Sequence, residues 1–206
     1  MYKSCTGMSN HTNHKNVQEI FTKMTTYTSP QQYHKVSIAL HWLMLVLMIA
    51  VYACIELREL YPKGSDIREN FKTWHFMIGL LILSLASFRL IFRISQATPP
   101  ILPTPPKWQT GLAHLVHTFL YILMIAVPIG GWLMLSAAGK PIPFFGLSLP
   151  ALIEENKDLA KTIKKIHTTV GEIGYYVIAL HTVAALFHHY IIKDNTLQRM
   201  LPTKKS

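Results

Sequence analysis

Charged residues are missing from four long stretches of the chain, and this pattern constrains the fold more than any other feature. Asp, Glu, Lys and Arg are absent from residues 36–55, 73–88, 108–139 and 173–192. Only 15% of all residues are charged, against roughly 25% in a typical soluble domain. A soluble fold of 206 residues would have to cover every side of four such segments with other parts of the chain, whereas a lipid bilayer covers them directly. The sequence therefore predicts an integral membrane protein.

Each uncharged stretch lies in a segment long enough to cross a membrane as a helix. A hydrocarbon layer about 30 Å thick requires roughly 20 helical residues, because no backbone polar group stays unpaired in it. The expected spans are residues 36–57, 74–94, 112–137 and 166–192. The predicted fold class is an all-α membrane protein, a four-transmembrane-helix bundle within a domain of residues 33–206. Residues 1–32 are polar and are expected to form a disordered tail.

The basic residues indicate how such a bundle is oriented. Four spans place both termini on the same side of the membrane. The tails and the connection between the second and third spans carry slightly more Lys and Arg than the opposite side, which favours cytoplasmic termini. The formal net charge of +10 is divided among the connections and forms no single basic stripe. It therefore indicates charge that flanks a membrane rather than a nucleic-acid partner.

Histidine, not cysteine, is the residue type suited to hold a cofactor in this chain. With only two Cys residues, a disulfide framework, a four-thiolate iron–sulfur or zinc site and a C-x-x-C-H haem attachment are all excluded. Of the 11 His residues, His41, His75, His167 and His181 lie in or at the edges of three spans. An imidazole in hydrocarbon is costly unless it faces the bundle interior and finds a partner. Several together therefore favour a functional role.

The depth of these histidines in the membrane predicts two pairs. His167 and His181 are 14 residues apart, which is about four helical turns or roughly 21 Å along one face. Depth alone pairs His75 with His167 and His41 with His181. Gly174 lies midway between the two histidines of the fourth span and is expected to leave room for a flat ligand.

Two histidine pairs at two depths match two b-type haems, each held by two imidazoles in the core of a helix bundle. Arg89 is the only charge in the inner half of the second span, so it needs a counter-ion; a propionate of the inner haem or the lipid headgroups would supply one. A metal transporter is an alternative, although zinc sites are usually completed by carboxylates or thiolates. Histidines that only bond neighbouring helices are a second alternative.

Several sequence motifs carry a family resemblance. They are Ser37-Ile-Ala-Leu-His41-Trp42, His75 followed four residues later by Gly79, Thr110-Gly-Leu-Ala-His114-Leu-Val-His117, the His167–His181 spacing and the ending His188-His189-Tyr-Ile-Ile-Lys193-Asp194-Asn195-Thr-Leu. From about residue 33 to the C-terminus, the chain resembles the bacterial cytochrome b561 family, and within it the stand-alone superoxide:ubiquinone oxidoreductases. The resemblance implies that the haem ligands fall on His41, His75, His167 and His181, and that Gly79 lies beside a haem.

The resemblance also implies an activity and a location. A protein of this kind would lie in the bacterial inner membrane, oxidise superoxide to molecular oxygen on the periplasmic side, and pass the electrons through two haems to ubiquinone. It would need lipid, superoxide and ubiquinone, without an obligatory protein partner. The alternative function is a non-catalytic cytochrome b subunit that relays electrons between the quinone pool and a redox partner protein.

Two groups of residues are candidates for the substrate steps. Lys161, Lys164 and Lys165 precede His167 and are expected to attract the superoxide anion, although a solvated helix face would look the same. His188 lies one to two turns beyond His181 and is expected to deliver protons to the quinone. His117, which is also expected to face a cofactor, and Lys193 are weaker candidates for that role.

Overall fold

Four long helices make up most of the protein. The computed structural model describes residues 32–202, so that of the expected tail, residues 1–32, all but Gln32 lies outside the described residues. The helices are α2 (Lys35–Leu57), α3 (Asp66–Ile94), α4 (Lys107–Ala137) and α5 (Lys157–Phe187). Each is long and apolar enough to cross a membrane. The predicted all-α fold with four membrane-spanning helices is confirmed.

Three of the helices begin several residues before the expected spans. α3 begins after Ser65, whose side chain accepts a hydrogen bond from the backbone N–H of Arg68. α5 begins after Asn156, whose side chain accepts one from Leu159 N–H at 3.0 Å. These caps satisfy backbone donors that the first helical turn leaves free. The charged first turns of α3 and α5 are therefore helical ahead of the apolar segments.

A β-hairpin between α4 and α5 was not predicted from the sequence. Strand β1 (Ile142–Phe144) pairs antiparallel with β2 (Leu147–Leu149). Phe145 and Gly146 form the turn with φ angles of 45° and 86°, and this pair of left-handed residues suits a two-residue hairpin turn. Ile142 is buried against α3 and α4, so the hairpin is packed onto the helices.

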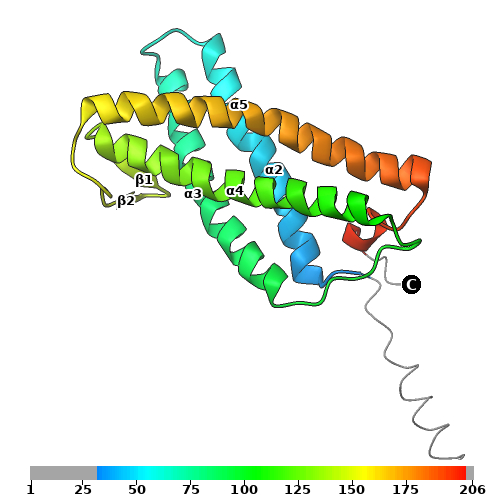
Figure 1. The fold of residues 1–206 in the computed structure, drawn as a ribbon. Helices are drawn as coiled ribbons and strands as arrows, with labels where there is room; N and C mark the ends of the chain where they lie inside the picture. The colour runs from blue at the N-terminus through cyan, green and yellow to red at the C-terminus, as the bar shows by residue number, and fades with distance from the viewer. Residues whose placement is uncertain (1–31, 203–206) are drawn as a thin grey trace, which may run out of the picture. The chain divides into compact units, whose positions relative to one another are not determined.

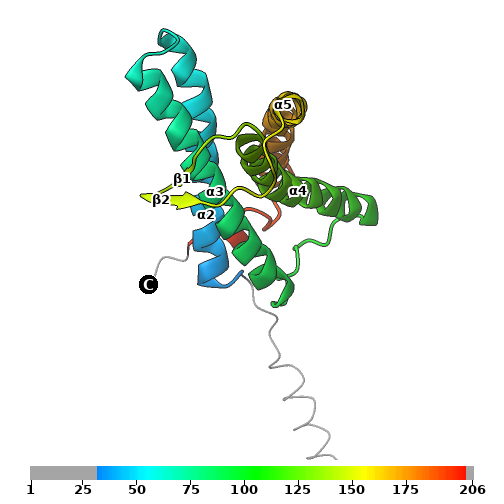
Figure 2. The ribbon, with the colours of Figure 1, turned by 90° about the vertical axis from the view of Figure 1, so that its left-hand side faces the viewer.

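The helices pack as two antiparallel pairs. α2 packs on α3 and α4 on α5, while contacts between α3 and α4 join the pairs. Figures 1 and 2 show the α2–α3 pair crossing the α4–α5 pair steeply. A core cluster of Met44, Val51, Ile82, Ala86 and Met124 lies between α2, α3 and α4. Long side chains of α2 and α5 meet across the bundle interior, where the candidate site lies.

The two ends of the bundle differ. At the hairpin end lie the α2–α3 connection and the hairpin. At the terminal end lie the start of α2, the α3–α4 connection rich in proline, and residues 193–202, which we call the C-terminal strap. α5 passes into the strap through the short π-helix η2 (His188–Ile192). The strap lies beside the start of α2, since Trp42 Nε1 donates a hydrogen bond to Met200 O at 2.7 Å (Figure 1).

Candidate functional site

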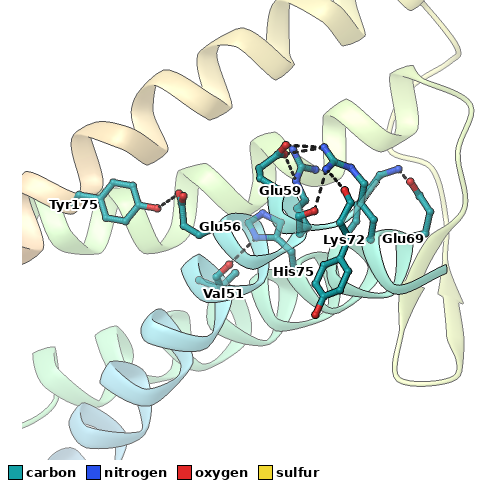
Figure 3. Close-up of polar contacts among 10 residues, drawn as sticks. Val51, Glu56, Glu59, Glu69, Lys72, His75 and Tyr175 are labelled. Atoms are coloured by element: carbon teal, nitrogen blue, oxygen red, sulfur yellow. Dashed lines mark hydrogen bonds and ion pairs between the residues drawn. The ribbon is translucent and has the colours of Figure 1, made fainter. Parts of the chain in front are cut away.

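One pair of histidines lies toward the hairpin end. The ring centres of His75 on α3 and His167 on α5 are 6.1 Å apart. His75 Nδ1 lies 2.9 Å from Val51 O, and His167 Nδ1 lies 3.0 Å from Val127 O (Figure 3 shows the His75 contact). A carbonyl only accepts hydrogen bonds, so Nδ1 of each ring carries the proton, which leaves Nε2 with a lone pair that is free to bind a metal.

A second pair of histidines lies toward the terminal end. The ring centres of His41 on α2 and His181 on α5 are 6.2 Å apart. His117 on α4 is a third imidazole in this group, with its ring centre 5.3 Å from that of His181. The structure thus brings together the two pairs predicted from depth, while their binding of iron stays a prediction.

The spacing of both pairs fits a shared metal ion. A metal–imidazole bond is about 2 Å long and the ring centre lies about 1 Å behind the nitrogen, so two imidazoles on opposite sides of one metal place their centres roughly 6 Å apart. The hairpin-end pair and the terminal-end pair both have this separation.

A cavity of about 820 Å³ extends into the bundle beside the hairpin-end pair. All four helices line it, and both His75 and His167 are in its wall. Its volume lies within the range of about 300–1,000 Å³ that is usual for cofactor and ligand sites. Gly79 and Gly171, each four residues after one of these histidines, also line it, and a Cβ atom at either glycine would meet nothing within 4 Å. The free space beside these two glycines, one helical turn from each histidine, suits a flat cofactor. Gly171 was not predicted from the sequence.

Two other glycines serve side-chain packing. Gly174 lines the cavity, but the space expected to be free for a ligand is taken by the Tyr52 hydroxyl, which a Cβ on Gly174 would strike. Gly131 lets α4 approach α5 closely, because its Cβ would lie 3.3 Å from Cε1 of the His167 ring. The expected role of Gly174 is therefore corrected: it makes room for Tyr52.

Arg89 lies near the terminal-end pair, and one nitrogen of its side chain lacks a hydrogen-bond partner within residues 32–202. Its side chain is half-buried, and its Nε is a buried polar atom without a hydrogen-bond partner among the described residues. The guanidinium carbon lies 5.8 Å from the centre of the Tyr121 ring. The positive charge of Arg89 lies close enough to His41 and His181 to interact electrostatically with both rings. A buried cation of this kind fits an anionic group of a cofactor.

Basic side chains line the cavity at the hairpin end. They come from four separate segments: Arg58, Lys63, Arg68, Lys72, Lys140, Lys161 and Lys164. Fewer acids share the same wall: Glu56, Glu59, Glu69 and Glu172. Glu56 accepts a hydrogen bond from the Tyr175 hydroxyl at 2.7 Å (Figure 3). The balance of charge at this end of the cavity is positive.

The cations of this wall differ in how freely their charge acts. Four are held in ion pairs: Arg58 with Glu59 at 3.0 Å, Arg68 with Glu59 at 2.8 Å, Lys72 with Glu69 at 2.8 Å and Lys161 with Asp158 at 3.0 Å. Within residues 32–202, Lys63, Lys140 and Lys164 form no ion pair. Of the three lysines singled out from the sequence, Lys161 and Lys164 line the cavity, whereas Lys165 is exposed and is not in its wall.

His188 lies at the junction of α5 and the C-terminal strap. Its Nδ1 is 2.6 Å from Oδ2 of Asp194. It is not in the wall of the hairpin-end cavity, and lies seven residues beyond His181. Because seven residues are nearly two full turns, His188 lies on about the same face of the helix as His181, roughly 10 Å further along. Lys193, at the helix end, adopts a left-handed conformation with φ of 60°.

Comparison with known proteins identifies the family. The profile described as prokaryotic cytochrome b561 matches residues 32–203. The chain belongs to the prokaryotic cytochrome b561 family. The family predicted from the histidine motifs is thus confirmed.

Relatives of this cytochrome b561 family member match almost over their full length. Cytochrome b561 homolog 1 of Escherichia coli (strain K12) is 40% identical over 174 residues, which are 84% of this chain and 99% of the relative. A protein named probable superoxide oxidase CybB, from Yersinia pestis, is 41% identical over 175 residues, 85% of this chain and 98% of the relative. Cytochrome b561 homolog 2 of E. coli (strain K12) is 29% identical over 184 residues, 89% of this chain and 98% of the relative.

Membership of the cytochrome b561 family defines the chemistry of the site. The protein is an integral membrane oxidoreductase that binds b-type haem and transfers electrons. A b-type haem held by two imidazoles requires an apolar slot between helices. The histidine pairs, the cavity and its glycine wall fit that requirement.

Proposed function

We propose that this cytochrome b561 is a superoxide:ubiquinone oxidoreductase of the bacterial inner membrane. Two superoxide anions each lose one electron and leave as molecular oxygen, and one ubiquinone takes up the two electrons and two protons to become ubiquinol. The observation that carries the proposal is the cavity that joins the hairpin-end histidines to a predominantly basic wall. The name of the Yersinia pestis relative, probable superoxide oxidase, supports the same substrate.

Four histidines hold the cofactors in this proposal. His75 and His167 bind one haem and His41 and His181 bind the second. Haem iron supplies one-electron transfer. With two imidazoles bound to each iron, no coordination position would remain for superoxide, and the haems would serve as one-electron carriers. Arg89, with its unpartnered Nε, pairs with a propionate near the terminal-end histidines.

The lysines of the cavity wall bring the anion to the hairpin-end histidines. Superoxide is small and carries one negative charge, so a basic wall raises its local concentration and its rate of encounter. Lys63, Lys140 and Lys164 are suited to this task because no acid neutralises them within the described part of the chain. The hairpin end then faces the periplasm, and both termini lie on the cytoplasmic side.

Quinone reduction takes place toward the terminal end. His188 lies beyond His181 on the same helix face and belongs to a ring–carboxylate pair, so it is placed to hold and release a proton. His117, close to His181, is a second imidazole on this side of the bundle. The electrons thus enter at one end of the helices and leave at the other.

The test uses the purified protein alone in detergent or vesicles. Enzymatically generated superoxide should reduce the haems within the mixing time, and ubiquinol should form when a soluble ubiquinone analogue is present. His188→Gln should leave haem content and absorption spectrum unchanged while slowing ubiquinol formation. Haems that accept electrons from dithionite but not from superoxide would contradict the proposal and favour an electron-relay subunit.

A further inference from the structure

The end of α5 is tied to the C-terminal strap by an imidazole–carboxylate contact. His188 Nδ1 and Asp194 Oδ2 are 2.6 Å apart. The chain reaches this geometry by leaving the regular α-helix: one π-helical turn follows His188, and Lys193 then takes a left-handed conformation. Single π-turns and left-handed residues other than glycine are uncommon, and they occur often at functional sites.

Asp194 is enclosed and held at both oxygens. Its side chain is 1% exposed, whereas that of His188 is 21% exposed. The second carboxylate oxygen, Oδ1, accepts a hydrogen bond from Thr196 N–H at 2.8 Å. Because an ionised carboxylate only accepts hydrogen bonds, Nδ1 of His188 carries its proton toward Asp194, and Nε2 becomes the ring atom that exchanges protons elsewhere.

Hydrogen bonds attach the C-terminal strap, and with it Asp194, to the proline-rich connection. Asn195 Oδ1 accepts a hydrogen bond from Leu102 N–H at 2.8 Å, and Asn195 N–H donates to Leu102 O at 3.2 Å. Arg199, which is buried, donates to the carbonyl oxygen of Pro99. These bonds attach the strap to the proline-rich connection, so that the carboxylate keeps its position relative to α5.

Unsatisfied polar atoms lie in the same segment. Among the described residues, His189 Nδ1 and Arg199 Nε are buried without a hydrogen-bond partner. Buried polar atoms in folded proteins nearly always have one. Arg199 Nε donates hydrogen bonds, and His189 Nδ1 donates one in the tautomer that protonates it; the carbonyl oxygens of a quinone are acceptors for such donors.

We infer that Asp194 is a positioning residue for quinone reduction, which orients His188 so that Nε2 delivers protons to a reduced quinone oxygen. This inference rests on the proposed function and assigns the residue that controls its proton step. In that step the Nε2–H bond of the doubly protonated ring breaks and an O–H bond forms on the quinone. The electrons come from superoxide through the haems, and the ring keeps its remaining proton on Nδ1, facing Asp194.

Among the residues that the structure describes, few other charged groups face this contact. Arg199 of the strap acts on Asp194 through its charge, and Arg93 of α3 and Tyr33 in turn flank Arg199. The proline-rich connection packed against the strap has no titratable residue between residues 98 and 106. His188 is therefore the titratable ring that contacts the carboxylate directly.

The experiment separates proton delivery from folding and from haem reduction. Haem-loaded protein is reduced with a limited amount of dithionite, a soluble ubiquinone analogue is added, and haem re-oxidation is followed from pH 5 to pH 9. For Asp194→Asn we expect at least a tenfold slower re-oxidation at neutral pH, since acid–base catalysis contributes about 10²–10⁴-fold. The pH profile should also differ from that of the wild type, because the amide of Asn places no negative charge opposite Nδ1 of His188.

The matched control is Asn195→Ala, which removes the side-chain hydrogen bonds of Asn195 to the proline-rich connection. The backbone bond between Asn195 N–H and Leu102 O and the bond from Arg199 to Pro99 O remain, so the strap keeps His188 and Asp194 in place. Its pH profile should coincide with that of the wild type. An unshifted profile in Asp194→Asn, or the same shift in Asn195→Ala, would overturn the inference and leave the proposed function intact. Wild-type haems that are not re-oxidised by the quinone at any pH would overturn the proposed acceptor, and the inference with it.

Discussion

The hydroxyl group of Tyr52 fills the space in which a side chain on Gly174 would lie. Tyr52 on α2 reaches across the bundle and donates a hydrogen bond to the carbonyl oxygen of Gly171 on α5, at 2.8 Å. The ring centres of Tyr52 and Tyr175 are 4.2 Å apart, and the Tyr175 hydroxyl in turn reaches Glu56 of α2. α2 and α5 are thus joined by side chains in the wall of the cavity, and the contact between Tyr52 and α5 requires a glycine at position 174.

Gly174→Ala should therefore destabilise the protein in spite of the higher helix propensity of alanine. Insertion of a methyl group into a filled space costs about 1–3 kcal/mol, more than the roughly 0.5–1 kcal/mol that alanine contributes in a helix. Thermal unfolding in detergent should show a lower midpoint for this variant. Tyr52→Phe removes the clashing oxygen, so the double variant should unfold at a higher temperature than Gly174→Ala alone. Equal midpoints for Gly174→Ala and the wild type would contradict the packing described.

Gly79 and Gly171 should respond differently, because nothing in the protein fills the space beside them. Gly79→Leu and Gly171→Leu are expected to fold but to retain about half of the haem, since the new side chain occupies the cofactor cavity. Haem and protein are quantified on the purified variants. Gly111→Leu on α4 is the matched control: a Cβ there also meets nothing within 4 Å, and Gly111 lies outside the cavity wall. Full haem content in both cavity variants would refute the placement of a haem there.

Charge-free segments were enough to predict the helices, because lipid leaves few alternatives to a helix of that length. The depth of four histidines on those helices then predicted which rings meet, since helix geometry converts sequence spacing into depth. The hairpin escaped prediction because its strands are three residues long and its turn, Phe145-Gly146, is a weak signal on its own.

Contacts between segments far apart in the sequence could not be predicted, for a different reason. Lys63 and Lys140 join Lys164 in one cavity wall only through the fold, and no periodicity connects them. Asp194 reaches His188 through a π-helical turn and a left-handed residue, which regular helix geometry does not anticipate. Gly174 was predicted to leave room for a flat ligand, but the group that lies against it is a tyrosine of another helix, which helix spacing alone does not reveal.

Single replacements of the four histidines should remove haem in pairs. If His75 and His167 share one iron, then His75→Ala, His167→Ala and the double variant should each lose the same haem, about half of the total. His41→Ala and His181→Ala should lose the other half, and His75→Ala combined with His41→Ala should lose nearly all of it. Haem quantification and the reduced-minus-oxidised absorption spectrum measure this directly. An unchanged pigment content in any single variant would disprove the ligand assignment for that residue.

The three unpaired lysines of the cavity wall should control the reaction with superoxide. Replacement of Lys63, Lys140 and Lys164 together by Gln is expected to slow haem reduction by superoxide about tenfold at low ionic strength and to flatten its salt dependence. Reduction by dithionite serves as the internal reference for intact haems. Lys35→Gln with Lys107→Gln removes charge from the opposite end of the bundle and should leave the superoxide rate unchanged. Equal rates in the cavity variant and the wild type would show that these charges do not guide the substrate.

The C-terminal strap should loosen in acid. Burial acts to raise the pKa of Asp194, but hydrogen bonds from His188 and Thr196 outweigh it and hold the pKa below its usual value. A carboxyl group whose pKa is lower in the folded than in the unfolded state stabilises the fold above its unfolded pKa, about 3.9 for Asp, and this stabilisation is lost as the pH falls through the folded pKa. Backbone amides of residues 193–201 should therefore lose protection from hydrogen exchange below about pH 4, after correction for the intrinsic exchange rate. Asp194→Asn should already show weak protection at pH 7 and little further change in acid. Strap amides in the wild type whose protection does not fall at any pH below 4 would show that the carboxylate does not hold the strap to α5.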